Sequence, residues 1–190
     1  VTGCGATSGV TSCIGNVLTI TGKIDVPSMS TCIIDADKVV IESNGVIDAS
    51  NKGYVGGERS DDKINQCRGT YTSCGGGGYY GKGGIGCDGG CNNARYDIVS
   101  VGDSSLISLQ PDTPGSGGGN TGTSSYIRAF GGNGGGKIII NTDYLDLKGK
   151  IAADGGAGNN GNGVDLLYYV SGGGSGGRIT INTKTLLFDQ

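Results

Sequence analysis

A repeated pattern of alternating apolar residues constrains the fold of this chain more than any other feature. Residues 137–154 read KIIINTDYLDLKGKIAAD, and apolar side chains take every second position within each of its three parts. Such period-two alternation is typical of strands with one buried face. Gly149 stands between two of these parts, where we expect the chain to turn a corner.

The same pattern recurs in other parts of the chain. Residues 178–190 repeat it at a shift of 41 residues, residues 18–26 repeat its second half without a gap, and residues 41–49 repeat its corner. A repeat of this kind predicts an architecture before local propensities are considered. The corner glycines Gly22 and Gly45 are 23 residues apart, roughly the length that three short strands need. We therefore expect an all-β solenoid, a short parallel β-helix with long Gly-rich loop insertions.

Stacking of like residues in successive coils predicts continuous interior rows, with neighbours about 4.8 Å apart. One row contains Ile24, Ile47 and Ile151, and another contains Ile140 and Ile181. The recurring pairs at the corners are expected to satisfy backbone groups and to stack as ladders; they are Asn141–Thr142 and Asn182–Thr183.

The domain organisation follows from where the repeats stop. Gly supplies 42 of the 190 residues, about three times its usual share, so part of the chain is expected to be core and part loop. We expect one domain over residues 1–190: a cap-like segment (1–16), first coils (17–50), a Gly/Cys-rich insertion (51–136) and further coils (137–190) with a Gly-rich loop at 154–177. Within the insertion, residues 97–109 are expected to form a hairpin or a further coil, and 126–130 another strand piece. The sequence stops in mid-coil, so a fragment or a subunit of a longer assembly is expected.

Cysteine usage indicates an oxidising compartment. The seven cysteines all lie in the first half of the chain, and the absence of His excludes a Cys/His zinc site. We expect disulfides and a secreted protein, with Cys4 and Cys13 tying the cap-like segment. Because the count is odd, at least one thiol is free or pairs outside this sequence. The disulfide candidates are Cys4, Cys13, Cys32, Cys67, Cys74, Cys87 and Cys91.

Charge and hydropathy argue against two classes of partner. The net charge is −3, and the 14 Lys and Arg residues are scattered rather than gathered in a stripe, so no nucleic acid is expected. No apolar run approaches the roughly 18 residues of a membrane span, so none is expected.

Asp25 and Asp48 are the candidate metal ligands. Each follows an inward-facing Ile one coil apart, so both carboxylates are expected to point outward and to stack. They could share a Ca²⁺ with loop carbonyls or form the acid pair of a glycosidase. The favoured interpretation is a solvated charged face, which Lys23 and Lys150 can neutralise, and Ala152 takes this row in the third repeat. No other cofactor is expected.

Tyrosines in the Gly-rich segments are candidates for a contact surface. They can pack on bare glycine backbone and anchor a loop, or they can stack on sugars or contact proteins. The four singled out are Tyr79, Tyr80, Tyr168 and Tyr169.

The pattern GG-[KR]-I-x-I-N-T…L-x-L-x-G-K-I-x-A-x-G-G spans residues 135–156, and part of it recurs in 176–190. It resembles the Gly-rich coils of secreted and cell-surface right-handed parallel β-helix proteins of the adhesin and surface-fibre type. The resemblance covers less than half of the chain. It implies a right-handed β-helix, an extracellular setting and a structural or adhesive role, and it brings no catalytic residues.

These observations favour a structural extracellular protein that builds a surface layer or fibre through solenoid stacking and loop contacts. Its expected partners are copies of itself or other surface and fibre proteins. The alternative is a carbohydrate- or cell-binding adhesin module with glycan partners. A polysaccharide lyase or hydrolase is third, because the chain has no His, the commonest general acid or base, and a non-enzyme is expected.

Overall fold

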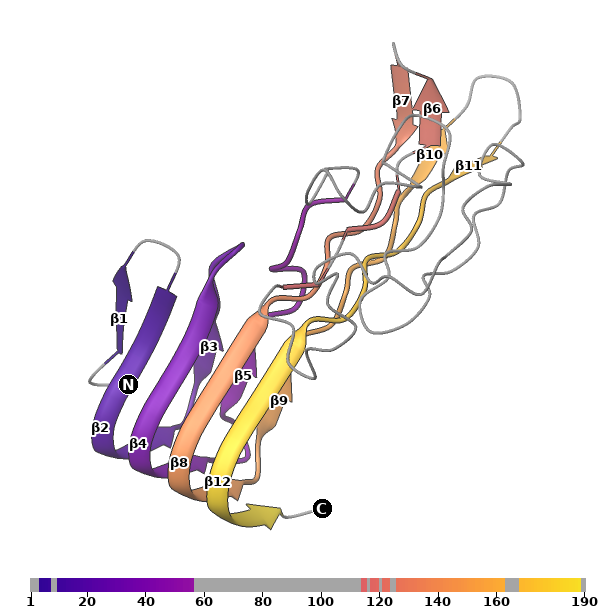
Figure 1. Ribbon diagram of the computed structural model, residues 1–190. Helices are drawn as coiled ribbons and strands as arrows, with labels where there is room; N and C mark the ends of the chain where they lie inside the picture. Colours follow the sequence, from indigo (N-terminus) through magenta and orange to yellow (C-terminus); the bar gives the residue numbers. More distant parts are fainter. Residues whose placement is uncertain are drawn as a thin grey trace, which may run out of the picture.

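The computed structural model describes residues 4–7, 10–56, 114–115, 117–119, 121–123, 126–162 and 168–188. Strands, turns and irregular segments make up these residues, and none of them forms a helix that is long and apolar enough to cross a membrane. Parallel sheets lie at one end of the molecule, and Gly-rich segments extend away from them (Figure 1). The prediction of an all-β chain with parallel sheets is therefore confirmed.

Two sheets form the body of the molecule. The larger has the order β1-β2-β4-β8-β12: β1 (Cys4–Thr7), β2 (Val10–Ile20), β4 (Thr31–Ile41), β8 (Lys137–Leu147) and β12 (Arg178–Phe188). All neighbours in it are parallel except β1, which runs antiparallel to β2. The smaller sheet is parallel throughout, with the order β3 (Lys23–Asp25), β5 (Val46–Asp48) and β9 (Lys150–Ala152). Because β4 pairs directly with β8, the long insertion between them leaves the sheet uninterrupted.

Two antiparallel strand pairs lie at the far end of the Gly-rich extension (Figure 1). They are β6 (Thr121–Thr123) with β7 (Tyr126–Ala129), and β10 (Asn160–Asn162) with β11 (Tyr168–Val170). The strand β7 confirms the strand piece predicted at residues 126–130. Residues 97–109, predicted as a hairpin or a further coil, lie outside the described residues.

The four long parallel strands bend within their length (Figure 1). In β8 the buried positions shift by one residue at Asp143, which is exposed between buried Thr142 and buried Leu145. The strand register also passes over Asp143 and its neighbours Asp37 and Lys184. A second corner follows at Gly149, between β8 and β9, as predicted. Each repeat, made of one long strand and one short strand, thus turns twice, and its apolar side chains point towards a common core.

The predicted interior rows are present. Ile24, Ile47 and Ile151 are aligned across the smaller sheet, and Ile140 is aligned with Ile181 across the larger one. Ile47 and Ile140 are fully buried, and each fully buried Ile contributes roughly 1.5–3 kcal/mol relative to an exposed one. The largest fully buried side chains are Ile20, Ile34, Ile41, Ile47, Ile138, Ile140, Leu145, Val26, Val39, Cys13 and Cys32.

The Gly-rich segments form an ordered bundle, where the sequence predicted loops. Residues 52–56, 114–119, 130–136, 153–159 and 171–177 exchange backbone hydrogen bonds, and we call their described residues the glycine bundle. The N–H of Gly53 donates to Gly134 (2.7 Å), that of Gly118 to Gly132 (2.8 Å), and that of Gly132 to Gly172 (2.9 Å). The bundle therefore joins parts of the predicted insertion (51–136) to the predicted loop (154–177).

Close backbone approach explains why these positions are glycine. A Cβ atom on Gly53 would collide with the carbonyl oxygen of Gly115, and one on Gly132 would collide with that of Gly156. Similar collisions occur at several pairs of glycines three residues apart (Gly53/Gly56, Gly115/Gly118, Gly132/Gly135 and Gly174/Gly177), and also at Gly117 and Gly131 beside them. A period of three is that of the polyproline II helix, and in collagen only Gly fits at the crowded axis of such chains.

The segment predicted as a cap (1–16) contains the first strands. The strand β2 begins at Val10, inside the segment 1–16 that was predicted as a cap, and β1 pairs with its first four residues. Cys13 is disulfide-bonded, and the register sets Cys4 opposite it. Cys32 is a free, buried thiol. Cys67, Cys74, Cys87 and Cys91 lie outside the described residues.

Candidate functional site

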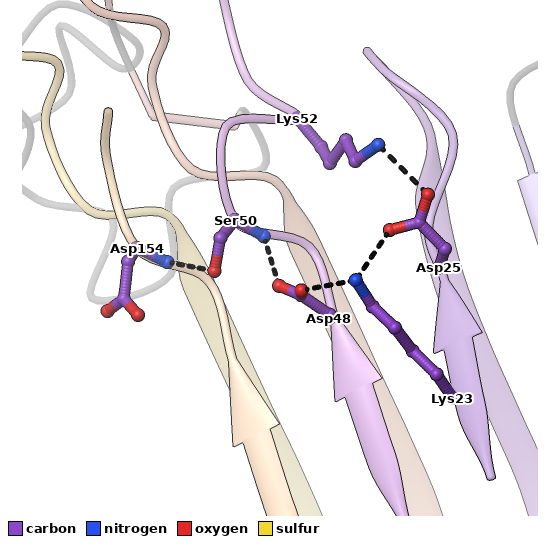
Figure 2. A network of polar contacts seen from close by, with 6 residues as sticks. All are labelled: Lys23, Asp25, Asp48, Ser50, Lys52 and Asp154. Carbon is purple, nitrogen blue, oxygen red and sulfur yellow. Dashed lines mark hydrogen bonds and ion pairs between the residues drawn. The ribbon is translucent and has the colours of Figure 1, made fainter. Parts of the chain in front are cut away.

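Asp25 and Asp48 stack on the outer side of the smaller sheet, as their positions after inward Ile residues predicted. They are direct neighbours in the register of β3 and β5, and Ala152 continues the row on β9. Figure 2 shows both carboxylates with Lys23 between them. The strand register alone therefore brings the two acids together.

Two lysines neutralise the acidic pair. The Nζ of Lys23 lies 2.8 Å from Asp48 Oδ2 and 3.4 Å from Asp25 Oδ1. The Nζ of Lys52 lies 3.2 Å from Asp25 Oδ2. The role expected of Lys23 is confirmed, whereas Lys52 was not anticipated. Lys52 follows Asn51, whose φ of 61° places it in the left-handed region. The alternation of apolar residues in strands does not predict a turn of this kind.

Backbone groups extend this network towards the third unit. The N–H of Ser50 donates to Asp48 Oδ1 at 2.9 Å, and the N–H of Asp154 donates to Ser50 Oγ at 3.1 Å (Figure 2). The hydrogen bond from Lys23, helped by Ser50, lowers the pKa of Asp48 to about 2. The hydrogen bond from Lys52 is the main cause of the lowered pKa of Asp25. The general acid of a glycosidase needs a raised pKa. Asp25 and Asp48 both have lowered pKa values, so their network does not have the electrostatics of such an acid pair.

The calcium hypothesis stays a prediction. Lys23 is the counter-ion between the two carboxylates, so a Ca²⁺ there would have to displace its ammonium group. Over the part of the chain that the structure describes, no cluster of three or more Cys, Asp and Glu side chains is placed to hold a metal.

A polar groove follows the corner of the larger sheet. It has a volume of about 520 Å³, and we call it the corner groove; it is lined by Asp35, Ala36, Asp37, Asn141, Thr142, Asp143, Asn182, Thr183 and Lys184. Within it, Asn182 Nδ2 donates to Asn141 Oδ1 at 2.8 Å, and Lys184 Nζ lies 2.9 Å from Asp143 Oδ1. The predicted Asn ladder is therefore present.

The Thr residues of the ladder bind the backbone at the corner, as predicted. Thr142 Oγ1 lies within hydrogen-bond distance of the carbonyl oxygens of Asp37 (3.2 Å) and Tyr144 (3.0 Å). Thr183 Oγ1 donates to the carbonyl oxygen of Thr185 at 2.8 Å. These bonds hold the bend in the strand, so part of the groove wall is structural.

The candidate contact tyrosines fall in two places. Tyr168 and Tyr169 lie on β11, where they pair with Asn162 and Gly161 of β10. Tyr79 and Tyr80 lie outside the described residues. The role of all four as a contact surface stays a prediction.

Comparison of the chain with protein-family models, curated proteins and solved structures gives no match. Its function is therefore inferred from its own residues and their arrangement.

Proposed function

We propose that this chain is a short right-handed parallel β-helix that serves as a structural extracellular protein, a building block of a surface layer or fibre. The observation that carries this proposal is the in-register ladder of repeated units. Each of three units contributes a long bent strand and a short one: β2–β3, β4–β5 and β8–β9. Units that bury their apolar faces only against neighbours are the design of repeat proteins.

The disulfide at Cys13 supports an extracellular setting. Disulfides persist in oxidising compartments and are rare in the cytosol. The glycine bundle supports a structural role, because most of its close contacts join backbone to backbone, and the side chains of Asn133 and Ser171 also hydrogen-bond backbone groups within it. The proposed partners are copies of the chain or other surface and fibre proteins.

The test is the location of the protein on cells that produce it. Antibodies raised against the folded chain are used for immunogold electron microscopy on intact and on permeabilised cells. We expect labelling of the surface of intact cells, and an unrelated cytosolic protein labelled only after permeabilisation serves as the control. Labelling confined to the interior of permeabilised cells would refute the proposal.

Glycan binding at the corner groove is a second candidate function. The groove presents carboxylate, amide, hydroxyl and ammonium groups along three neighbouring strands, and such groups hydrogen-bond sugar hydroxyls. A glycan array tests it with Asp35→Asn and Asn182→Ala, which change the groove, and with Asp25→Asn as the control outside it. We expect both groove variants to lose binding and the control to keep it. A wild-type protein that binds no glycan removes this candidate.

A further inference from the structure

The corner groove holds two carboxylates that have no partner in the described part of the chain. Asp35 and Asp37 on β4 line the groove, and both are exposed. Neither of their carboxylates has a hydrogen-bond or ion-pair partner among the described residues. The other described acids on strands each lie within ion-pair distance of a lysine; they are Asp25, Asp48, Asp143 and Asp146. The groove therefore has unbalanced negative charge at its β4 end.

The lysines next to these two acids have partners of their own. Lys184, on the β12 side of the groove, lies 2.9 Å from Asp143 Oδ1. Lys38 directly follows Asp37, but its Nζ lies over the Tyr144 ring, 4.9 Å from the ring centroid. A ligand can therefore supply the positive charge that Asp35 and Asp37 lack.

The spacing of the two carboxylates suits an ammonium group. Asp35 and Asp37 are two residues apart on one strand and both line the groove, so their Cα atoms are about 6.5 Å apart. An ammonium group between them can donate to both carboxylates at about 2.8 Å, the usual length of a charge-assisted hydrogen bond. Such bonds are roughly twice as strong as those between neutral groups.

Hydrogen-bonding groups without charge continue from Asp35 across the next two strands. In the strand register Asp35 lies beside Asn141 on β8, and Asn141 lies beside Asn182 on β12. Neighbouring strands are about 4.8 Å apart, and the hydrogen bond from Asn182 Nδ2 to Asn141 Oδ1 orients the two amides. On the other side of β4 the row ends in Ile14, an apolar side chain of β2 that is 67% exposed. The groove thus has a charged end at β4 and amides towards β12.

We propose that the corner groove binds a glycan that carries a free amino group. The protonated amino group lies between Asp35 and Asp37, and sugar hydroxyls contact the amides of Asn141 and Asn182. The sugar chain therefore runs across the strands, from β4 towards β12. This inference rests on glycan binding, the second candidate function, and narrows its ligand to amino sugars that are not acetylated. A neutral N-acetyl group in the same place would take water from two carboxylates and offer a single donor in return, which is costly.

Isothermal titration calorimetry with two oligosaccharides of equal length tests the proposal. One consists of glucosamine and carries ammonium groups, and the other consists of N-acetylglucosamine and is neutral. We expect the glucosamine oligomer to bind at least about 10-fold more tightly at neutral pH, as for one charge-assisted hydrogen bond. Asp35→Asn and Asp37→Asn are each expected to remove most of this preference. Asn182→Ala is expected to weaken the binding of both oligomers.

Asp154→Asn is the matched control for the charge of the protein. Asp154 is exposed and lies outside the groove, and its substitution changes the net charge by the same amount as Asp35→Asn. We expect it to leave both affinities unchanged. An effect as large as that of Asp35→Asn would show that only the overall charge matters, and would overturn the proposal. Urea unfolding of each variant verifies that it is folded.

The wild-type protein alone also decides between the outcomes. Equal binding of the two oligomers would overturn this inference and leave glycan binding as it stands. A short oligolysine peptide that binds as tightly, and needs the same two acids, would show that the groove takes ammonium groups of proteins and would overturn the assignment to a sugar. Absence of binding to any glycan would remove the second candidate function as well. None of these outcomes alters the cell-surface labelling expected for the structural role.

Discussion

Asp48 shows how one side chain can report the register of a whole sheet. β3 and β5 pair in register, with Asp25 beside Asp48, so Lys23 lies on the same face two residues before Asp25 and its ammonium group reaches the Asp48 carboxylate diagonally. The same carboxylate accepts the Ser50 N–H, which orients the turn that leads to Lys52. A single ionised group thus joins two strands and the turn that follows them.

Asp48→Asn is predicted to lower the free energy of unfolding at neutral pH, with little effect near pH 2. The folded-state pKa of Asp48, about 2, lies below its ordinary value of 3.8. The ion pair therefore stabilises the fold above pH 4, and this contribution is lost as the pH falls towards 2. We expect the variant to lose about 1 kcal/mol at pH 7, after allowance for solvent screening. Urea unfolding of both proteins at a series of pH values measures the difference.

The control for this prediction is Asp154→Asn. Asp154 contributes its backbone N–H to the network, and the substitution keeps that group. The wild-type and Asp48→Asn unfolding free energies should converge near pH 2. A difference that stays constant from pH 7 to pH 2 would contradict the electrostatic explanation.

Cys32 is predicted to resist thiol reagents in the folded protein. It is fully buried, and desolvation raises the pKa of its thiol to about 11. Only the thiolate reacts, so this shift alone slows alkylation at pH 8 by about 100-fold. Iodoacetamide labelling followed by peptide mapping, with and without denaturant, gives the rate at this residue. Labelling of Cys32 in the native protein at the rate seen in denaturant would show that the core there is open.

At the scale of elements, the glycine bundle is the least expected part of the structure. The sequence shows many glycines but predicted only loops, because low-complexity glycine carries no apolar alternation. The three-residue spacing of Gly115/Gly118 and Gly132/Gly135 becomes meaningful only when neighbouring backbones are seen to touch. Their partners come from segments far apart in the chain, so local patterns hold no information on them.

Gly132→Ala is predicted to destabilise the fold, whereas Gly176→Ala is not. A Cβ at Gly132 would collide with the Gly156 carbonyl, while one at Gly176 would be 3.9 Å from its nearest neighbour, the Ala153 carbonyl oxygen. Overpacking of this kind costs about 1–3 kcal/mol. At an unstrained site, Gly→Ala stabilises by about 0.4–1 kcal/mol through the unfolded state. Thermal and urea unfolding of the two variants compare them, and equal effects would mean that the bundle is not closely packed.

At the scale of the whole molecule, the sheets and the glycine bundle are one continuous structure. The N–H of Gly136 donates to Ala49 (2.7 Å), that of Gly177 to Ala153 (2.6 Å), and that of Arg178 to Gly136 (2.9 Å). These bonds lie where each segment passes from bundle to strand. A substitution that disrupts the packing of the bundle should therefore also destabilise the core of the sheet.

Native-state hydrogen exchange tests this coupling. In Gly132→Ala we expect the amides of Ile47 and Ile140 to exchange faster by the factor that corresponds to the loss of global stability. The amides of the bundle itself should change by the same factor. Faster exchange in the bundle alone, with the amides of the two Ile residues unchanged, would show that the two regions open separately.

Much of the sheet could be predicted from the sequence by itself. Period-two alternation and the corner glycines identify the strands, and the repeat identifies which residues stack, so the row of Ile24, Ile47 and Ile151, the Asp25–Asp48 pair and the Asn141–Asn182 ladder are all found. These features depend on positions within a repeat, and the repeat can be recognised in the sequence alone.

The tertiary structure alone decided the rest. The approach of Lys52 depends on a left-handed turn at Asn51, and the bundle depends on contacts between distant segments. The antiparallel pairing of β1 with β2 was likewise seen only in the structure. A sequence records periodicity along one chain, but not which distant backbones approach closely. For residues 137–154 the outcome combines both: the alternation predicted β8 and β9, and only the structure showed that β8 lies between β4 and β12 while β9 pairs with β5.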